Sequence, residues 1–275
     1  MMKLSGFADE ISADLDEQVR VLNEENIRFV ELRGVWNKNV AVLDKADVDR
    51  IKDTLKAGEI GVSAIGSPIG KTGIEEPHGP HFDTFRRILD IAVELNSPYI
   101  RLFSFYLPQN ADPAHYRNQI LDRFHTMLEA AEGSGVMLLH ENETGIYGDT
   151  AERCLDLIEA VNHPGFRAIF DPANFIQRKQ KPFTHCYPLL KEHIEYCHIK
   201  DAIMETGQVV PAGEGDGEVP ELMQALQKKG YSGFLSLEPH LQEAGRAGGF
   251  SGPELFKKAS QALKSILERL DIVYS

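Results

Sequence analysis

The chain has 275 residues, of which 42% are hydrophobic and 26% charged, a balance typical of soluble globular proteins. It carries 42 acidic against 29 basic residues, and this formal net charge of −13 argues against nucleic-acid binding because it repels phosphate backbones. The three cysteines form no CxxC pair, so they indicate neither a disulfide framework nor a zinc ribbon. The first ten residues do not resemble a signal peptide, and no run of 18 apolar residues predicts a membrane span. We therefore expect a cytoplasmic protein that makes no membrane contact.

Eight short β-rich runs alternate with amphipathic stretches along the chain. We predict strands at Lys3–Ala8, Phe29–Arg33, Val62–Ser67, Tyr99–Phe103, Val136–Glu141, Arg167–Asp171, Tyr196–Lys200 and Phe234–Glu238. We predict helices near 12–26, 45–58, 78–95, 112–133, 150–162, 184–194, 218–229 and 253–270. Asp112-Pro113 and Gly252-Pro253 are typical helix starts. Strict alternation implies parallel strands with right-handed crossovers, and eight repeats in this length predict an α/β fold, a single-domain (β/α)8 TIM barrel over residues 1–275.

Ionisable side chains lie at the ends of most of these predicted strands. In chain order they are Glu31 and Arg33, Arg101, Glu141, Asp171, His198 and Lys200, and Glu238 and His240. The carboxyl ends of the strands form the active-site face of such barrels, so we expect these groups to meet there. Alternation along each strand would turn Glu141 and Leu139 inward and His140 toward the helices.

Three carboxylates and one imidazole, from Glu141, Asp171, His198 and Glu238, would crowd negative charge into a partly dry space. Such a cluster is costly unless a cation neutralises it. Oxygen ligands with one nitrogen suit Mn²⁺, Mg²⁺ or Co²⁺, and Zn²⁺ is also compatible. The pattern therefore predicts one divalent metal ion at the mouth of the barrel.

Each residue also has a simpler interpretation when it is taken alone. Asp171 is typical of a helix N-cap, and His198 is typical of a structural histidine. Lys200 is expected to pair with Asp201 or with an acid at the barrel mouth. Glu31 is expected to pair with Arg101 or Arg33, while Arg101 alternatively binds a carboxylate or phosphate of the substrate.

Several short motifs at these positions resemble those of the xylose isomerase-like superfamily of sugar isomerases and epimerases. Gly135-Val-Met-Leu-Leu-His-Glu141-Asn142 resembles the motif of its fifth strand, and Phe170-Asp171-Pro172-Ala173-Asn174 resembles that of its sixth. His198-Ile-Lys-Asp201, the loop Pro211-Ala-Gly213-Glu214-Gly215 and Leu237-Glu238 resemble the motifs that follow. The order and spacing of these motifs cover nearly the whole chain.

The resemblance implies that Glu141, Asp171, His198 and Glu238 bind one metal ion and that Glu141 and Glu238 form an acid–base pair. In the mechanism that this pair suggests, Lys200 is expected either as an additional proton carrier or as a partner of the substrate oxyanion. Substrate contacts are expected from a group of polar residues at the barrel mouth. They are Glu31, Arg101, Asn174 and His240. The sequence departs from the family at Asn174, where its epimerases often carry a histidine. Asparagine does not transfer protons near neutral pH, which argues against a tagatose- or psicose-type epimerase.

These expectations describe a metal-dependent sugar isomerase or epimerase acting on a small sugar or polyol through an enediolate. Three alternatives remain. An inosose-type dehydratase shares the first proton removal. A sugar-binding barrel without catalysis would need a broken metal site, and an abasic-site endonuclease would need more histidine ligands. Phe7 and Trp36 are expected either as apolar pocket walls or as ordinary packing residues. The glycine-rich stretch 239–252 is expected either as a lid or as a flexible loop. A homo-oligomer is expected only by analogy with other barrels.

Overall fold

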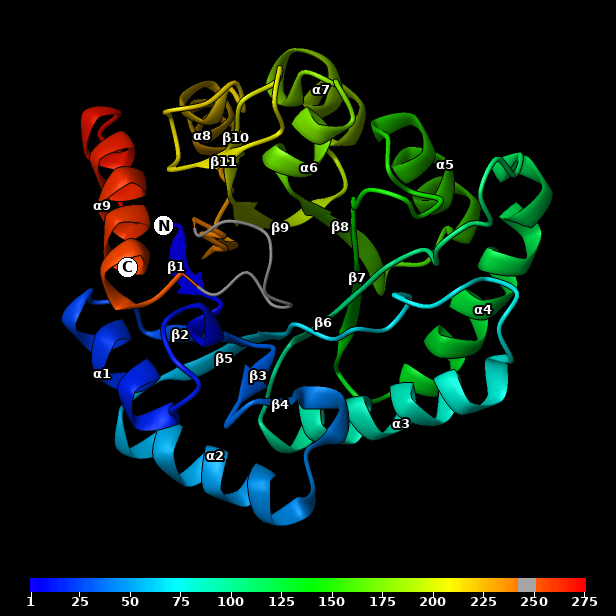
Figure 1. Cartoon of the computed structure of the whole chain (residues 1–275), viewed down its shortest axis with the longest axis horizontal. Coiled ribbons are helices and arrows are strands. Elements are labelled where there is room, and N and C mark those ends of the chain that lie inside the picture. Colours follow the sequence, from blue (N-terminus) through cyan, green and yellow to red (C-terminus); the bar gives the residue numbers. More distant parts are fainter. Residues whose placement is uncertain (242–250) are drawn as a thin grey trace.

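The computed structural model describes residues 1–241 and 251–275, and its centre is an eight-stranded parallel sheet in the order β1-β12-β9-β8-β7-β6-β5-β2 (Figure 1). The strands are β1 (Lys3–Gly6), β2 (Phe29–Leu32), β5 (Gly61–Ile65), β6 (Tyr99–Leu102), β7 (Met137–Glu141), β8 (Phe166–Phe170), β9 (Ile194–Ile199) and β12 (Phe234–Leu237). An isolated parallel bridge between Phe7 and Glu31 joins the ends of β1 and β2 and nearly closes the sheet into a barrel. The eight predicted strands and the barrel fold are confirmed.

Helices surround the strands in a ring (Figure 1). They are α1 (Leu15–Glu24), α2 (Lys45–Ala57), α3 (His78–Glu94), α4 (Pro113–Ala131), α5 (Ala151–Val161), α7 (Tyr187–Leu190), α8 (Val219–Lys228) and α9 (Pro253–Arg269). The Asp112 side chain accepts a hydrogen bond from the Ala114 amide and caps α4, and α9 begins at Pro253. Both predicted helix starts are therefore confirmed.

The connection between β8 and β9 differs from the prediction of one helix near 184–194. Helix α6 (Pro172–Gln177) begins directly after β8, capped by the Asp171 side chain. A π-helical turn, η3 (Pro182–Cys186), then leads into α7, which has only four residues. Prolines at the start of each segment remove backbone donors, so three short helical pieces replace a continuous helix.

Two short hairpins and two 3₁₀ turns complete the face at the carboxyl ends of the strands. The hairpins are β3 (Gly34–Val35) with β4 (Lys38–Asn39), and β10 (Asp201–Ala202) with β11 (Val209–Val210). The 3₁₀ turns are η1 (Ala8–Glu10) and η2 (Val40–Val42).

Side chains alternate along the strands between the barrel interior and the helical layer. Ala64, Leu139, Ile169, Tyr196 and Phe234 pack together in the interior. Phe170, Cys197 and Leu237 instead join the larger core against the helices. The inward register puts Glu141 and His198 on the same face as this interior cluster, as alternation predicts.

No helix in the described ranges is long and apolar enough to cross a membrane. The expectation of a lid or flexible loop at 239–252 falls mainly on residues 242–250, which lie outside the described residues.

Candidate metal centre

Four chain segments bring three carboxylates and one imidazole to the centre of the barrel mouth. Glu141 ends β7, Asp171 follows β8, His198 lies near the end of β9 and Glu238 follows β12. Each offers one ligand atom, these atoms lie within 4.8 Å of one another, and all four residues are buried. The structure thus brings together the four residues that the sequence singled out for a metal.

The donor atoms of this cluster fit one divalent ion. Nδ1 of His198 lies 2.9 Å from Oε1 of Glu141, 3.7 Å from Oε2 of Glu238 and 3.9 Å from Oδ2 of Asp171. Ligand atoms about 2.1 Å from one ion are at most about 4.2 Å apart, so small shifts would suffice. Oδ2 of Asp171 is buried and lies 2.9 Å from Nζ of Lys200, while Oδ1 accepts the Asn174 backbone amide and caps α6. Asp171 therefore caps α6 with one oxygen and offers the other to the cluster as a metal ligand.

Glu31 lies behind the imidazole of His198. Its two carboxylate oxygens are 3.2 and 3.3 Å from Nε2, and both side chains are fully buried. The ring of Phe7 packs edge-on against the imidazole at 5.1 Å. A carboxylate on the far nitrogen fixes the tautomer and the ring orientation of a metal-binding histidine. Here that arrangement turns Nδ1 toward the cluster.

Three cations hold the carboxylates of the cluster. Nζ of Lys200 lies 2.8 Å from Oε2 of Glu238 and 2.9 Å from Oδ2 of Asp171. Arg101 donates to Oε2 of Glu141 at 3.2 Å and to the Gly66 carbonyl at 3.1 Å. Arg33 donates to Oε1 of Glu238 at 3.2 Å.

These neighbours set the protonation of the cluster. Burial alone would raise the pKa of Glu141, but the charges of His198 and Arg101 hold it at about 2. Burial likewise opposes charge on Glu238, yet Lys200 and His240 keep its pKa well below the usual range. Burial raises the pKa of Asp171 to about 6 against the opposing effect of Lys200. Glu141 and Glu238 are thus carboxylates at neutral pH.

A cavity of about 240 Å³ opens above the cluster. Its lining consists of Arg33, Asn39, Gly66, Pro68, Lys71, Arg101, Glu141, Glu143, Glu238 and His240. Arg101 and His240, both expected at the substrate, are part of this lining. Glu31 and Asn174, also expected at the substrate, are not part of this lining. The Asn174 amide donates instead to the Asn142 carbonyl at 2.8 Å and to Oε1 of Glu141 at 3.3 Å.

The ion pairs expected for Glu31 are wrong, and of the two alternatives for Lys200 only one is found. Glu31 pairs with His198 rather than with Arg101 or Arg33, because β6 directs Arg101 toward Glu141 and because Asp9 and Glu10 bind Arg33 at 2.7 Å. Lys200 does not pair with Asp201, whose carboxylate accepts four backbone amides instead. It pairs with two acids of the barrel mouth, as the alternative interpretation proposed.

Asp201 instead anchors the loop that follows β9. Its carboxylate accepts the backbone amides of Ala202, Gly213, Gly215 and Gly217 at 2.7 to 3.1 Å. A Cβ at Gly215 or Gly217 would lie 2.5 Å from Oδ1 of Asp201, so this close approach requires glycine at both positions. The GxGxG run thus fixes the strand end that carries Lys200.

Sequence reasoning missed Asp9, Glu10 and Lys71. Glu10 is fully buried, pairs with Arg33 at 2.7 Å and lies 3.3 Å from Nε2 of His240. Asp9 and Glu10 directly follow the first predicted strand, so the rule that identified the other strand ends would also have found them. Phe7 is fully buried between Arg33 and Arg101 and Trp36 packs under Arg50, so both are packing residues.

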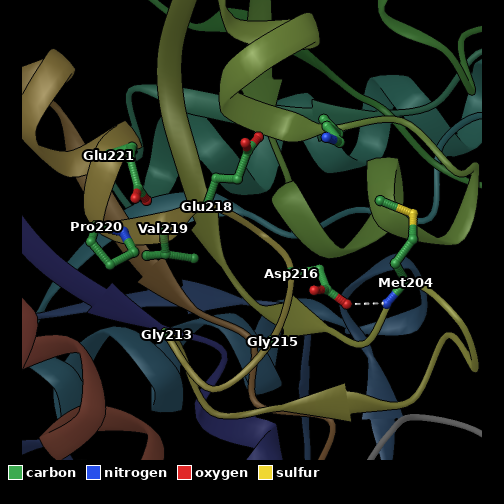
Figure 2. A pocket seen from close by; sticks show the side chains of 9 residues that line it. Met204, Gly213, Gly215, Asp216, Glu218, Val219, Pro220 and Glu221 are labelled. Carbon is green, nitrogen blue, oxygen red and sulfur yellow. Dashed lines mark hydrogen bonds between the residues drawn. The ribbon is translucent and has the colours of Figure 1, made fainter.

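A larger cavity of about 470 Å³ lies beside the start of α8 (Figure 2). The carboxylate of Asp216 accepts the Met204 amide at 2.6 Å, and that of Glu218 accepts the amides of Phe183 and Thr184. These acids are therefore engaged in holding loops together. Within the described ranges, the cluster at the barrel mouth is the one group of this kind suited to a metal.

Residues 19–266 match the model of the xylose isomerase-like TIM barrel family, so the chain belongs to that family. It is 24% identical over 187 residues to 2-epi-5-epi-valiolone 7-phosphate 2-epimerase of Actinoplanes sp., covering 68% of this chain. The chain spans 63% of the length of that relative and 55% of the length of a second one, an uncharacterised protein of Methanocaldococcus jannaschii that is 25% identical over 57% of this chain.

Solved structures share the fold. The D-psicose 3-epimerase of Clostridium cellulolyticum H10, solved with D-tagatose, has a TM-score of 0.78 at 14% identity, covering 98% of this chain and 99% of that one. The IolI protein, solved with a zinc atom, has a TM-score of 0.73 at 18% identity and 98% coverage of both chains. The protein is thus a xylose isomerase-like TIM barrel with a candidate buried metal site.

Proposed function

We propose that this protein is a divalent-metal-dependent sugar isomerase or epimerase that exchanges a proton at a carbon next to a carbonyl group. The observation that carries the proposal is the buried cluster of Glu141, Asp171, His198 and Glu238 beneath an open polar cavity. Those four residues would hold the ion. The oxygen-rich set with one imidazole suits Mn²⁺, Mg²⁺ or Co²⁺, with Zn²⁺ compatible. When bound, the ion supplies Lewis acidity that stabilises negative charge on neighbouring substrate oxygens.

Glu141 and Glu238 are the residues that we assign to proton transfer. They reach the cluster from β7 and β12, which are separated in the sheet by β8 and β9, so they approach it from different sides. Both line the cavity and both are ionised, so either can accept a proton from a bound substrate. Return of the proton from the opposite side would give an epimer, and return to the neighbouring carbon would give an isomer.

The surrounding side chains hold this pair in place. Asn174 donates to Oε1 of Glu141 and Arg101 to Oε2, so both oxygens of this base are oriented. Burial would lower the pKa of Lys200, but Asp171 and Glu238 raise it well above the usual value. We therefore assign Lys200 as a charged hydrogen-bond donor rather than as a proton carrier.

Proton NMR in D2O tests the function. Protein loaded with Mg²⁺ or Co²⁺ is incubated with ketoses, aldoses and inososes, and we expect deuterium to enter at a carbon next to the carbonyl of the true substrate. The product then distinguishes epimerisation, isomerisation and loss of water, which share the first proton removal. Failure of every sugar to exchange, with the metal confirmed in the protein, would contradict the proposal.

Glu31→Gln tests how the histidine is oriented. Glutamine keeps the volume of Glu31 but weakens the hold on Nε2 of His198, so we expect Mn²⁺ or Co²⁺ affinity to fall about 10- to 100-fold. Titration calorimetry measures the affinity. Glu195→Gln is a matched control, because Glu195 bonds Tyr99 away from the cluster and should leave metal affinity unchanged. Equal affinity in Glu31→Gln and the parent would exclude this role.

A further inference from the structure

The sheet of the barrel has a seam between β1 and β2. These strands lie side by side (Figure 1), yet they stand at the two ends of the strand order. Within the described ranges they are joined by an isolated backbone bridge between Phe7 and Glu31. Glu31, whose carboxylate lies behind the imidazole of His198, is therefore placed at this seam.

Strand β5, on the other side of β2, is irregular next to Glu31. The pairing of β2 with β5 shifts between Val30 and Glu31, so that Ser63 is an extra residue in β5. A β-bulge of this kind redirects side chains and is common beside functional sites. Here Ser63 and its neighbour Ala64 both face the barrel interior, whereas a regular strand would turn one of them outward.

The hydroxyl group of Ser63 uses its full hydrogen-bonding capacity in the interior. It donates to the backbone carbonyl of Val30 at 3.1 Å. It also lies 2.6 Å from the hydroxyl of Ser5 on β1 and 2.9 Å from that of Tyr196 on β9. Because a hydroxyl has one proton and two lone pairs, Ser5 and Tyr196 donate to Ser63. Ser5, Ser63 and Tyr196, all fully buried, form an interior hydroxyl cluster.

The interior hydroxyl cluster connects the strands on both sides of the seam. The bond between Ser5 and Ser63 joins β1 to β5, although β2 lies between those strands in the barrel. The bond to the Val30 carbonyl holds the peptide group that leads directly to Glu31. Buried hydroxyl and carbonyl groups are costly to leave unpaired, so each bond of the cluster keeps the others in place. The cluster thus fixes the backbone from which the Glu31 side chain reaches His198.

Tyr196 also contacts the imidazole directly. Its ring stands edge-on to that of His198, with the ring centres 5.8 Å apart and the planes at 89°. The hydroxyl bond to Ser63 holds the far end of the Tyr196 ring, so the orientation of this contact depends on the cluster as well. Carboxylate and aromatic partners of a ligating histidine set its orientation toward a metal.

We propose that Ser63 and Tyr196 are positioning residues for the candidate metal centre, and that they act by holding Glu31 against His198. Neither residue lines the cavity, so this role involves no contact with a substrate. The inference rests on the proposed function for the presence of the metal. It goes beyond that function by assigning part of the metal affinity to the interior of the barrel.

Titration calorimetry with Co²⁺ measures the effects of Ser63→Ala and Tyr196→Phe. Each change removes one hydroxyl and little volume, and each acts one step further from the ion than Glu31. We therefore expect Co²⁺ affinity to fall about 3- to 10-fold in both variants. Tyr99→Phe is the matched control, because it removes a buried hydroxyl that bonds Glu195 rather than the interior hydroxyl cluster. Its Co²⁺ affinity should equal that of the parent.

A double-mutant cycle distinguishes positioning from a general loss of stability. If Ser63 acts through Glu31, then Ser63→Ala should weaken Co²⁺ binding no further in a Glu31→Gln background. The visible absorption spectrum of bound Co²⁺, which reports the geometry around the ion, should change in Ser63→Ala and Tyr196→Phe but not in Tyr99→Phe.

Three results would overturn the inference while leaving the proposed function intact. They are parental Co²⁺ affinity in both Ser63→Ala and Tyr196→Phe, effects of Ser63→Ala and Glu31→Gln that simply add, and an equal loss of affinity in Tyr99→Phe. Failure of the parent protein to bind any divalent metal would instead contradict the proposed function, and the inference with it.

Discussion

Glu238→Gln should lower the rate of deuterium exchange about 1,000-fold even at saturating metal. Glutamine keeps the shape of the side chain and one oxygen but cannot accept the substrate proton, and a positioned general base contributes roughly 100- to 10,000-fold. The measurement is the exchange rate by proton NMR over a range of metal concentrations. Glu141→Gln should have the same effect, because Glu141 lines the cavity from the other side of the cluster.

Asp171→Asn separates metal binding from proton transfer. Asp171 caps α6 by accepting the backbone amide of Asn174. An asparagine oxygen can do the same, so the fold should persist. Asp171 does not line the cavity, so we expect weaker metal binding and exchange that recovers when metal is saturating. Recovery in Glu238→Gln as well would mean that Glu238 is only a metal ligand. If exchange in Asp171→Asn stayed low at saturating metal, Asp171 would be needed for more than metal binding.

The architecture was predictable because alternation is encoded locally. Each strand turns every second residue inward, so the positions of Glu141, His198 and Leu139 follow from the pattern of apolar neighbours. Parallel strands bring their carboxyl ends to one face, and this rule predicts that the four residues of the candidate metal cluster lie together without knowledge of any distance. Family membership then agrees with the order of the motifs.

The pairing of the charges was not predictable in the same way. Acids on several neighbouring strands could have paired with Arg101. Predicting that it pairs with Glu141 rather than Glu31 requires the relative positions of the strand ends along the barrel axis. Helix α6 was missed because six residues give too short a periodic pattern, although the Asp-Pro pair at its start is a typical signal. Lys71 lies in a loop after β5, where no periodicity indicates direction.

Asp201→Asn should destabilise the fold by about 3 to 4 kcal/mol, because it disrupts a buried carboxylate with four backbone donors. Oδ1 accepts the amides of Ala202 and Gly217, and Oδ2 accepts those of Gly213 and Gly215. Whichever way an asparagine turns, its NH2 group faces two amide donors that it cannot satisfy. Urea unfolding followed by circular dichroism measures the loss.

Asp216→Asn provides the matched comparison in the same loop. Asp216 is exposed and accepts one amide, that of Met204, so an asparagine oxygen can replace it at a cost of less than about 1 kcal/mol. A small effect in both variants would show that the glycine-rich loop holds its shape without the Asp201 carboxylate. A large effect in Asp201→Asn alone would show that these four hydrogen bonds stabilise the end of β9 and thereby the position of Lys200.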